Sequence, residues 1–593
     1  MYILGLNIGH NGTAALLKDG KIIGCISEER FSRIKNHSGF PIVAINYLLK
    51  ENKITLKDVD YITLDKHYLD HPLEKDHLMA KRMRENYVNQ KKFKKIISFI
   101  AYKYPNLIKF YRDIKKSIKP FYNKNHKNHN FFNSVERILK GYGMEMDKKK
   151  FLFLDHHLSH ALATCFNLNK KEKTLIFTLD GEGSGVCATI NVWDGNKISV
   201  ISRSKKDASL GYLYGIITMC LGMKPLEHEF KVMGLAPYAK RDKVEELYNK
   251  KFKNLIWVND NLEFESRFDM IYSDKFYIHE LKFERFDNIA GAVQKLTEDL
   301  TQEWIRKAIK KTDIHNVALS GGVFMNVKAN QKIYEMPEVK NLFVMPSCGD
   351  EVNAIGACFY GYKKYCEENN LKFDPKPIKD LYLGPEYNDE YIKNLIKSKN
   401  LSTKYKIKKI KKINKEVAKL LARGEIVARC SGRSEWGARA LGNRSILANA
   451  KNTDTIRILN ETIKDRDFWM PFTPSILDKY EKEYVINPKN MFAPYMCITF
   501  NSTEKAKKDI PAALHPYDFT LRPQIVTKDY NPDYYEIIEE FSKLTGIGGI
   551  LNTSFNLHGE PNVLTPEDAL HTVENSDLKY LAMGNYLFEK INL

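Results

Sequence analysis

Residues 3–29 read ILGLNIGHNGTAALLKDGKIIGCISEE, and residues 175–204 read LIFTLDGEGSGVCATINVWDGNKISVISRS. Each stretch shows an apolar strand, a glycine-rich turn, a second apolar strand, an Asp-Gly turn and a third strand. Asp-Gly between alternating apolar runs is typical of a β-hairpin. The glycines of the first turn let the backbone approach an anion closely. We therefore expect a duplicated three-stranded unit with an anion-binding turn in each copy.

Such a duplication followed by helices is the pattern of the actin-like ATPase fold, in which two lobes face a nucleotide cleft. The alternative is a pair of unrelated hairpins. Two strand–turn–helix units follow, at residues 316–333 and 342–362. In the first, the Ser320-Gly321-Gly322 turn exposes N–H groups that suit phosphate. In the second, Asp350 stands where a helix begins, and a plain N-cap is the simplest interpretation of that residue alone.

The stretch FLFLDHHLSHALATCF, residues 151–166, places two histidines four residues apart in a predicted helix. Positions four apart share one helix face, so the imidazoles of His156 and His160 can bind one metal ion. Such pairs also arise by chance, with one histidine buried and the other in solvent. The pair indicates a metal site only if further ligands come from elsewhere in the chain.

The chain has 593 residues and a formal net charge of +20. That length exceeds what one core supports, so we expect at least two domains. No uninterrupted apolar run reaches the roughly 18 residues of a membrane span. The N-terminus reads as a first strand rather than a signal peptide. Because the nine cysteines are scattered without a CxxC motif, we expect a cytoplasmic protein.

Basic and aromatic residues are densest between residues 81 and 150, in a predicted helical insertion at about 66–150. A solvated helical insertion is the simplest interpretation. An RNA surface, an anionic membrane surface and a dock for an acidic substrate are the alternatives. No nucleic-acid module accompanies the charge, so we expect no specific nucleic-acid partner.

A second domain is expected from residue 381 to 593, after a polar linker with two prolines at residues 366–380. Its segment GRSEWGARALGNRSI, residues 432–446, interleaves arginines with glycines. Arginine forks bind phosphate oxygens, and glycines let the backbone approach beside them. The basic residues that predict a phosphate or nucleotide site are Arg433, Arg439, Arg444, Lys464, Arg466 and Arg522.

The turn within LNTSFNLHGEP, residues 551–561, groups short polar side chains around Ser554. Such side chains can fix a small polar group such as a carbamoyl amide, although ordinary turn chemistry is the competing interpretation.

Ten motifs, in order along nearly the whole chain, resemble the O-carbamoyltransferases of the tobramycin, cephalosporin and nodulation protein U type. They are IGHNGTAAL, EERFSRIK, DHHLSHA, LDGEGSG, KVMGLAPY, SGGVFMNVKAN, CGDEVNAIGA, GARALGNRSI, LRPQ and LNTSFNLHGEP. The resemblance implies an α/β protein with a duplicated actin-like (ASKHA) domain at residues 1–365 and a YrdC-like α/β domain at 381–593. It implies that the second domain makes carbamoyl adenylate from carbamoyl phosphate and Mg²⁺-bound ATP. The first domain then moves the carbamoyl group to an acceptor hydroxyl.

The resemblance also implies residue roles in the first domain. His10 would take the acceptor proton, and Lys35 would stabilise developing negative charge. A divalent metal, Fe²⁺ first and Mn²⁺ or Zn²⁺ otherwise, would be held by His156, His160, Asp180 and Asp350. The adenylate would contact Gly183, Gly321, Gly322 and Asn326.

In the second domain the resemblance implies that nucleotide and carbamoyl phosphate are bound by Arg439, Arg444, Lys464, Arg466, Arg522 and Ser554. The chain departs from the family pattern at three positions: Asn11 replaces Asp, Ala438 replaces Pro, and Met470 replaces Arg. The change at position 11 removes a negative charge beside His10.

The acceptor is expected to be a sugar-like or natural-product hydroxyl, and a homodimer is possible for this class. Two alternatives stay open. One is a threonylcarbamoyladenosine-type tRNA-modifying enzyme built from the same two folds. The other is an ATP-binding, actin-like regulatory module without transfer chemistry, which would leave the arginine-rich domain unexplained.

Overall fold

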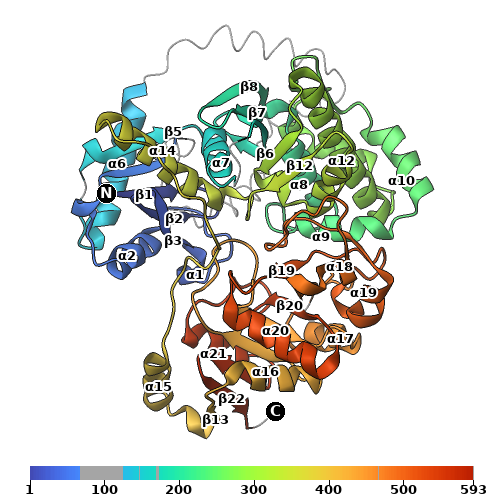
Figure 1. Cartoon of the computed structure of the whole chain (residues 1–593). Coiled ribbons are helices and arrows are strands. Elements are labelled where there is room, and N and C mark those ends of the chain that lie inside the picture. The colour runs from blue at the N-terminus through green and yellow to red at the C-terminus, as the bar shows by residue number, and fades with distance from the viewer. Residues whose placement is uncertain (67–123, 146, 169–171, 465, 592–593) are drawn as a thin grey trace. The chain divides into compact units, whose positions relative to one another are not determined.

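The computed structural model describes residues 1–66, 124–145, 147–168, 172–464 and 466–591 (Figure 1). The chain divides into two compact units. Unit 1 comprises Met1–Glu28 and Asn36–Pro377, and unit 2 comprises Glu29–Lys35 and Ile378–Leu593. Most of the basic insertion expected at residues 66–150 lies outside the described residues.

The chain passes between the units three times, after Glu28, Lys35 and Pro377. The last passage falls inside the stretch expected to be a linker, residues 366–380. The short excursion of Glu29–Lys35 into unit 2 differs from the sequence-based expectation of one continuous first domain over residues 1–365.

Unit 1 contains two five-stranded sheets. The strands of the first are β1 (Tyr2–Asn7), β2 (Thr13–Lys18), β3 (Lys21–Ser27), β4 (Tyr61–Asp65) and β5 (Phe151–Leu154). Those of the second are β6 (Thr174–Gly183), β7 (Val186–Trp193), β8 (Ile198–Lys205), β11 (Asn316–Ser320) and β12 (Asn341–Val344). A separate two-stranded sheet consists of β9 (Ile256–Val258) and β10 (Phe264–Ser266).

The two large sheets of unit 1 repeat one topology. Their orders are β3-β2-β1-β4-β5 and β8-β7-β6-β11-β12. In each, three antiparallel strands are followed by two strands that run parallel to the first of them. Positive φ angles at Asp19 (48°), Gly20 (83°) and Gly195 (95°) close the hairpins at the two Asp-Gly turns. The predicted duplication is present as two whole sheets rather than two isolated hairpins.

Two helices of unit 1 lie between these sheets in an exchanged arrangement. Helix α7 (His156–Cys165) follows β5 of the first sheet but packs on β6 and β11 of the second. Helix α14 (Asn353–Glu368) follows β12 of the second sheet but packs on β1 and β4 of the first. The helices also cross closely, because a Cβ at Gly356 would lie 2.0 Å from the Ser159 carbonyl oxygen. This crossing brings the N-terminal ends of α7 and α14 together.

The remaining described helices of unit 1 pack on the sheets or on one another, and α10 lies at the periphery against α12 (Figure 1). They are α2 (Ile42–Glu51), α6 (Lys124–Gly141), α8 (Leu210–Cys220), α9 (Glu229–Leu235), α10 (Arg241–Leu247), α11 (Asp274–Glu280), α12 (Phe286–Thr312) and α13 (Val327–Glu335). In the described part of the chain, no helix combines the length and apolarity needed to cross a membrane.

Unit 2 is built on one eight-stranded mixed sheet. Its strands are β13 (Tyr405–Lys409), β14 (Val427–Cys430), β15 (Arg444–Ala448), β16 (Thr473–Leu477), β19 (Gln524–Val526), β20 (Gly549–Ser554), β21 (Tyr580–Met583) and β22 (Tyr586–Lys590). Their order is β13-β22-β21-β14-β15-β20-β16-β19. Strands β17 (Val485–Ile486) and β18 (Asn501–Ser502) pair separately.

The helices of unit 2 are α1 (Glu29–Ser32), α15 (Asp389–Ser398), α16 (Ile413–Ala422), α17 (Asp454–Leu459), α18 (Glu481–Tyr484), α19 (Glu504–Asp509), α20 (Pro532–Thr545) and α21 (Pro566–Glu574). Strand β15 pairs antiparallel with both β14 and β20, matching Arg444 with Cys430 and Ser445 with Ser554. The loop from 431 to 443 and the turn after Ser554 therefore lie at the same end of these three neighbouring strands.

Candidate functional site

The four metal-ligating candidates of unit 1 meet at the start of α7. His156 and His160 lie on one face of this helix, Asp180 lies in β6, and Asp350 opens the 3-10 turn before α14. One ligand atom from each of the four lies within 4.8 Å of the other three. The exchanged packing of α7 and α14 is what brings the three segments together.

The spacing of these donors fits a divalent cation. Nε2 of His160 lies 3.4 Å from Asp180 Oδ2 and 3.8 Å from Asp350 Oδ1. Nε2 of His156 lies 3.7 Å from each of the same two carboxylate oxygens. Four donors held about 2.1 Å from one ion lie roughly 3.4 Å apart in a tetrahedron. Two imidazoles and two carboxylates suit iron, manganese or zinc.

A second layer of hydrogen bonds orients the ligands. Nδ1 of His156 donates to Asp65 Oδ2 at 2.5 Å, and Nδ1 of His160 lies 3.1 Å from Ser320 Oγ. We assign Nδ1 of His156 as the donor because a carboxylate only accepts, which leaves Nε2 as the metal-facing atom. Sequence reasoning missed Asp65. Its signal was the carboxylate that ends an apolar strand, the same pattern that marks Asp180.

The electrostatics of this cluster favour a cation. Burial lowers the pKa of His156, but the carboxylates of Asp65, Asp180 and Asp350 outweigh burial and hold that pKa well above its usual range. The pKa of His160 is raised by the same balance, through Asp180 and Asp350. Three carboxylates thus surround two imidazoles, and a bound divalent ion would offset the negative charge of the carboxylates. The ion would also compete with protons for the nitrogen atoms of the two histidines.

His157, which stands between the two ligands in sequence, has a structural role. Its Nδ1 lies 2.8 Å from Thr178 Oγ1, and its Nε2 lies 3.0 Å from the Val186 carbonyl oxygen. Burial, with a smaller effect from His156 and His160, lowers the pKa of His157 to about 3. A neutral, doubly hydrogen-bonded imidazole on β6 and β7 fixes the start of α7.

Two of the glycines expected to contact adenylate lie against the candidate metal ligands. A Cβ at Gly183 would lie 2.1 Å from the ring of His156, so only glycine admits that ring. The Gly322 amide donates to Asp180 Oδ2 at 3.2 Å. Gly321 adopts a φ of 103° that favours glycine, and it turns the chain tightly past β6.

Asn326, the fourth residue expected at the adenylate, caps α13. Its Oδ1 accepts from the Ala329 amide at 3.0 Å, and its Nδ2 donates to Gln294 at 2.8 Å. These bonds give Asn326 a structural role at the start of the helix that follows the glycine turn.

His10 lies in the turn between β1 and β2. The Asn7 side chain donates to the carbonyls of His10 at 2.7 Å and Asn11 at 3.1 Å, which fixes this turn. Asn11 has a φ of 56°, a conformation that asparagine tolerates. Its Nδ2 donates to Glu351 Oε2 at 3.2 Å, next to the ligand Asp350. The residue that departs from the family pattern therefore joins the His10 turn to the loop that carries a metal ligand.

Lys35 belongs to unit 2, whereas His10 belongs to unit 1. The pair that the resemblance places at one acceptor site is thus divided between the two units.

In unit 2, a buried network holds the loop that carries Arg439. Oε1 of Glu435 accepts from the amides of Leu441 at 2.8 Å, Asn443 at 2.9 Å and Arg444 at 3.1 Å. Arg429 donates to the Gly442 carbonyl at 2.8 Å from the opposite side. These bonds preorganise the residues on either side of Arg439.

Arg444, one of the expected phosphate-binding residues, hydrogen-bonds the backbone around it. The side chain is only 1% exposed. It donates to the carbonyls of Pro385, Ser431, Gly432, Asn443 and Leu564 at 2.9–3.3 Å. Its donors are therefore committed to the fold. Arg433 likewise donates to the carbonyls of Leu383 and Gly384.

The other basic candidates form a cationic cluster, defined here as Lys35, Arg439, Lys464, Arg466 and Arg522. Burial lowers the pKa of Lys464, and the charges of Arg466 and Lys35 lower it further. Burial lowers the pKa of Arg466 to about 10, with Arg439 contributing. Burial, Arg439 and Arg466 hold the pKa of Arg522 well below its usual range. An anionic ligand would relieve this mutual repulsion.

Lys464 is the most enclosed member of the cluster. It is 2% exposed. Its ammonium group donates to the Ser554 carbonyl, to the Asn556 carbonyl at 3.2 Å and to Asn556 Oδ1 at 3.0 Å. Arg466 donates to Thr553 Oγ1 at 3.3 Å in the same strand end. The turn around Ser554 therefore lies beside Lys464 and Arg466.

Residues 2–359 match the family model described as Carbamoyltransferase N-terminus, and residues 418–590 match the model described as Carbamoyltransferase C-terminus. The chain belongs to the carbamoyltransferase family. The four metal-ligating candidates lie within the first matched region, and Arg439 to Ser554 lie within the second. The segment Glu29–Lys35 of this carbamoyltransferase matches the N-terminal model although it belongs to unit 2.

Relatives of this carbamoyltransferase span its whole length. An uncharacterized protein of Methanocaldococcus jannaschii is 31% identical over 99% of this chain and 100% of its own. Nodulation protein NolNO of Sinorhizobium fredii is 27% identical over 98% of this chain and 79% of its own. Among solved structures, full-length HypF in its phosphate- and nucleotide-bound form covers 63% of this chain and 56% of its own, at 12% identity and a TM-score of 0.36.

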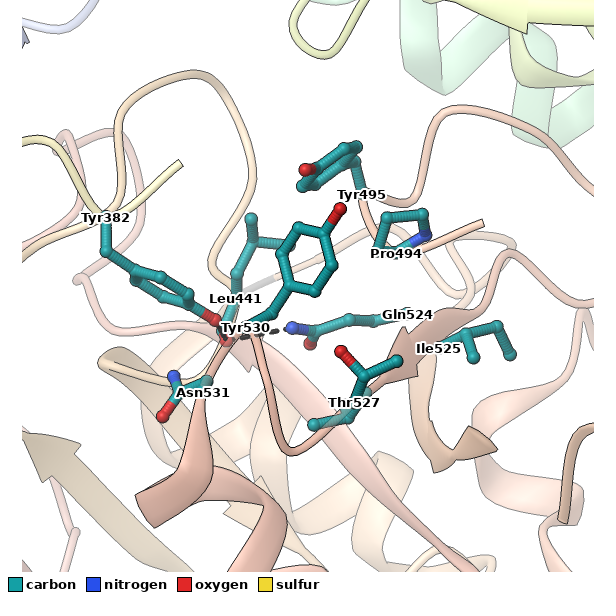
Figure 2. A pocket seen from close by; sticks show the side chains of 10 residues that line it. Tyr382, Leu441, Pro494, Tyr495, Gln524, Ile525, Thr527, Tyr530 and Asn531 are labelled. Carbon is teal, nitrogen blue, oxygen red and sulfur yellow. Dashed lines mark hydrogen bonds between the residues drawn. The ribbon is translucent and has the colours of Figure 1, made fainter. Parts of the chain in front are cut away.

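A small cavity lies behind the Arg439 loop of the carbamoyltransferase. Figure 2 shows Tyr382, Tyr495 and Tyr530 around it, with Gln524 at its base. Tyr382 and Gln524 both donate to the Leu441 carbonyl, at 2.8 and 2.9 Å. A volume of about 10 Å³ holds one water at most. The cavity is therefore too small for a substrate, and the hydrogen bonds from Tyr382 and Gln524 hold the loop in place.

We expect Arg444→Met to destabilise the carbamoyltransferase and Arg439→Met to leave its stability unchanged. The first change leaves five carbonyls without their shared donor, three of them in buried hydrogen bonds, at a cost of about 3 kcal/mol or more. The second removes a half-buried side chain whose loop is held by other residues. Thermal unfolding of both variants checks this. Equal unfolding temperatures for the two would contradict the structural role of Arg444.

Proposed function

We propose that this carbamoyltransferase makes carbamoyl adenylate from carbamoyl phosphate and ATP in unit 2, and transfers the carbamoyl group to an acceptor hydroxyl in unit 1. The observation that carries the proposal is the division of chemistry between the units. Unit 1 holds a four-ligand metal set, and unit 2 holds a cluster of cations. The acceptor is a hydroxyl of a sugar-like molecule or natural product.

The proposal includes the fold of each unit. The repeated sheet order and the exchanged helices α7 and α14 support an actin-like domain for unit 1. The mixed eight-stranded sheet with cations at one edge is compatible with a YrdC-like domain for unit 2.

In the proposed first reaction, water cleaves carbamoyl phosphate to carbamate and phosphate. A carbamate oxygen then bonds to the α-phosphorus of ATP, and the bond from that phosphorus to the leaving pyrophosphate breaks. Lys464, Arg466 and Arg522 bind phosphate oxygens of the two substrates, and Arg439 is presented by its fixed loop. Their positive charges stabilise the charge that develops on the phosphates, together with the Mg²⁺ that accompanies ATP.

In the proposed second reaction, the acceptor oxygen bonds to the carbamoyl carbon, and the bond from that carbon to the AMP oxygen breaks. His10 takes the proton from the acceptor hydroxyl. His156, His160, Asp180 and Asp350 would hold the divalent metal, Fe²⁺ by expectation and Mn²⁺ or Zn²⁺ otherwise. When bound, this ion supplies a Lewis acid for the carbamoyl carbonyl or the adenylate phosphate.

Purified protein should release pyrophosphate and phosphate from ATP and carbamoyl phosphate without any acceptor, and should form carbamoyl adenylate. Omitting carbamoyl phosphate should abolish pyrophosphate release, because carbamate is the nucleophile. Enzyme-coupled phosphate assays and mass spectrometry of the nucleotide check this. ATP turnover that is independent of carbamoyl phosphate would favour a regulatory ATPase instead. Turnover that requires threonine and tRNA would favour tRNA modification.

A further inference from the structure

The side chain of Glu351 is enclosed directly after the candidate metal ligand Asp350. The residue is only 4% exposed. Its Oε1 accepts from the hydroxyl of Ser347, and its Oε2 accepts from Nδ2 of Asn11 at 3.2 Å. A Cβ at Gly349 would lie 2.4 Å from the same Oε2, so glycine there leaves room for the carboxylate. Both oxygens of Glu351 therefore have a donor, and one donor comes from a segment 340 positions away.

The loop between β12 and α14, which carries Glu351, is fixed to the second sheet of unit 1. The Met345 amide donates to the Leu319 carbonyl of β11 at 2.9 Å. The Gly321 amide, just after β11, donates to the Cys348 carbonyl at 3.0 Å. Strand β11 lies next to β12 in this sheet. These bonds hold the backbone before Glu351 in one place.

The turn between β1 and β2, which carries His10, is fixed to the first sheet by bonds of its own. Besides the bonds from the side chain of residue 7, Oγ1 of Thr13 donates to the Asn11 carbonyl at 2.7 Å. The Gly12 amide donates to the His37 carbonyl at 2.8 Å. The side chain of Asn11 then reaches from this turn to the loop of the second sheet.

This hydrogen bond decides which side chains suit positions 11 and 351. A carboxylate only accepts, so the amide of Asn11 must turn its nitrogen toward Glu351. The aspartate of the family pattern at position 11 would instead bring a second negative charge against the enclosed Glu351 carboxylate. Like charges in contact repel strongly where water is excluded. The asparagine of this chain therefore matches the glutamate at position 351.

We infer that the bond between Asn11 and Glu351 positions His10 relative to the candidate metal ligand Asp350, and that residues 11 and 351 are a matched pair. His10 directly precedes Asn11, and Asp350 directly precedes Glu351. The bond thus connects the neighbours of two groups that the proposed mechanism uses.

The inference rests on the proposed function, in which His10 takes the proton of the acceptor hydroxyl. A misplacement of about 1 Å can cost about 100-fold in rate, so the distance between the two turns matters for transfer. Asn11 and Glu351 act through His10 and Asp350 and are therefore positioning residues.

Three variants separate the bond from the charges. Asn11→Asp places two carboxylates in contact and should displace the turn that carries His10. In Asn11→Asp/Glu351→Gln the roles are exchanged, because the new amide donates to the new carboxylate. The net charge of this double variant equals that of the wild type, and the amide oxygen can still accept from Ser347. Glu351→Gln alone should keep the bond, because the Asn11 amide can turn and accept.

Asn370→Asp is the matched control for the change of asparagine to aspartate. Asn370 is exposed, and its φ of 53° is close to the 56° of Asn11. The control therefore adds the same charge at the same backbone conformation, away from the pair.

The ring of His10 reports its own position by NMR in protein with isotope-labelled histidine, and its signal is assigned by its loss in His10→Gln. In metal-free protein the signal should move in Asn11→Asp and return in the double variant. With Mn²⁺ bound, paramagnetic broadening of the signal depends steeply on the distance to the ion. A displacement of about 1 Å should change it by roughly 1.5-fold or more in Asn11→Asp, with recovery in the double variant. Asn370→Asp should match the wild type.

An unchanged His10 signal in folded, metal-free Asn11→Asp would overturn the inference. A change that persists in the double variant would also overturn it, because the added charge alone would then explain the effect. Wild-type protein without pyrophosphate release dependent on carbamoyl phosphate would refute the proposed reaction. The His10 signal in metal-free protein needs neither turnover nor metal, so it would still decide whether the pair positions this residue.

Discussion

Replacing His156 with alanine should abolish tight metal binding and carbamoyl transfer while sparing acceptor-free pyrophosphate release. The change removes one of four ligands and leaves the Asp65 carboxylate without its histidine partner. Loss of a ligand should weaken metal affinity by more than about 100-fold, since loss of an outer partner alone costs 10- to 100-fold. Metal content after dialysis against Fe²⁺, Mn²⁺ or Zn²⁺ measures the first effect. Phosphate-release assays measure the second.

Two further variants sharpen this result. Asp65→Asn keeps all four ligands but loses the carboxylate behind His156, so it should show a smaller loss of metal affinity, about 10- to 100-fold. His279→Ala, an exposed histidine of α11, should bind metal as the wild type does. If folded His156→Ala lost both half-reactions equally, the assignment of separate sites to the two units would be wrong.

Replacing Lys464 with methionine should give the opposite pattern, with loss of adenylate formation and unchanged metal binding. Lys464 is enclosed at the Ser554 turn, and no solvent can replace its charge there. We expect acceptor-free pyrophosphate release to fall by about 100-fold or more, as when a preorganised donor is removed from a transition state. Metal titration of the same preparation shows whether unit 1 is intact.

The lowered pKa of Lys464 adds a pH dependence to this prediction. A bound anion favours the protonated amine, so the pKa rises on binding and ATP binding takes up a proton. Affinity for ATP should therefore increase as the pH falls toward the pKa of the free site, and Lys464→Met should lose this dependence. Calorimetry in buffers of different ionisation enthalpy detects the proton uptake. Lys451→Met, an exposed lysine of unit 2, serves as control, and an unchanged pH profile in Lys464→Met would exclude this residue as its source.

The duplicated sheets could be predicted because their signals are local. Asp19, Gly20 and Gly195 fix the hairpin turns, and the apolar runs beside them specify strands. The excursion of Glu29–Lys35 could not be predicted in the same way. The motif EERFSRIK does not reveal whether its residues pack in unit 1 or in unit 2. That packing depends on contacts with Gly437 and Asn562, which lie hundreds of residues away in the sequence.

For the candidate sites too, local sequence patterns could be recognised, whereas residues brought together from distant segments could not. The spacing of His156 and His160 made them candidate metal ligands from the sequence alone, whereas Asp180 and Asp350 entered only through the family motifs. Asp65 was missed because it lies 91 positions from His156 in the sequence, with no local pattern that links the two. Arg439 and Arg444 look equivalent in sequence, yet the second donates to five carbonyls. Composition cannot tell whether the donors of an arginine face a ligand or the backbone.

The three passages of the chain between its units bear on how such a protein can change over generations. Two domains joined by a single chain passage could be exchanged or lost independently by recombination at that passage. Here residues 378–593 expressed alone would lack Arg30, Arg33 and Lys35, and residues 1–377 expressed alone would carry those side chains without their partners. Recombination at the residue 377 boundary would succeed only with a donor that presents matching carbonyls at positions 437, 561 and 562, which accept hydrogen bonds from Arg30 and Arg33. The seven-residue segment therefore restricts recombination, because its sequence must match the residues of the C-terminal part that it contacts.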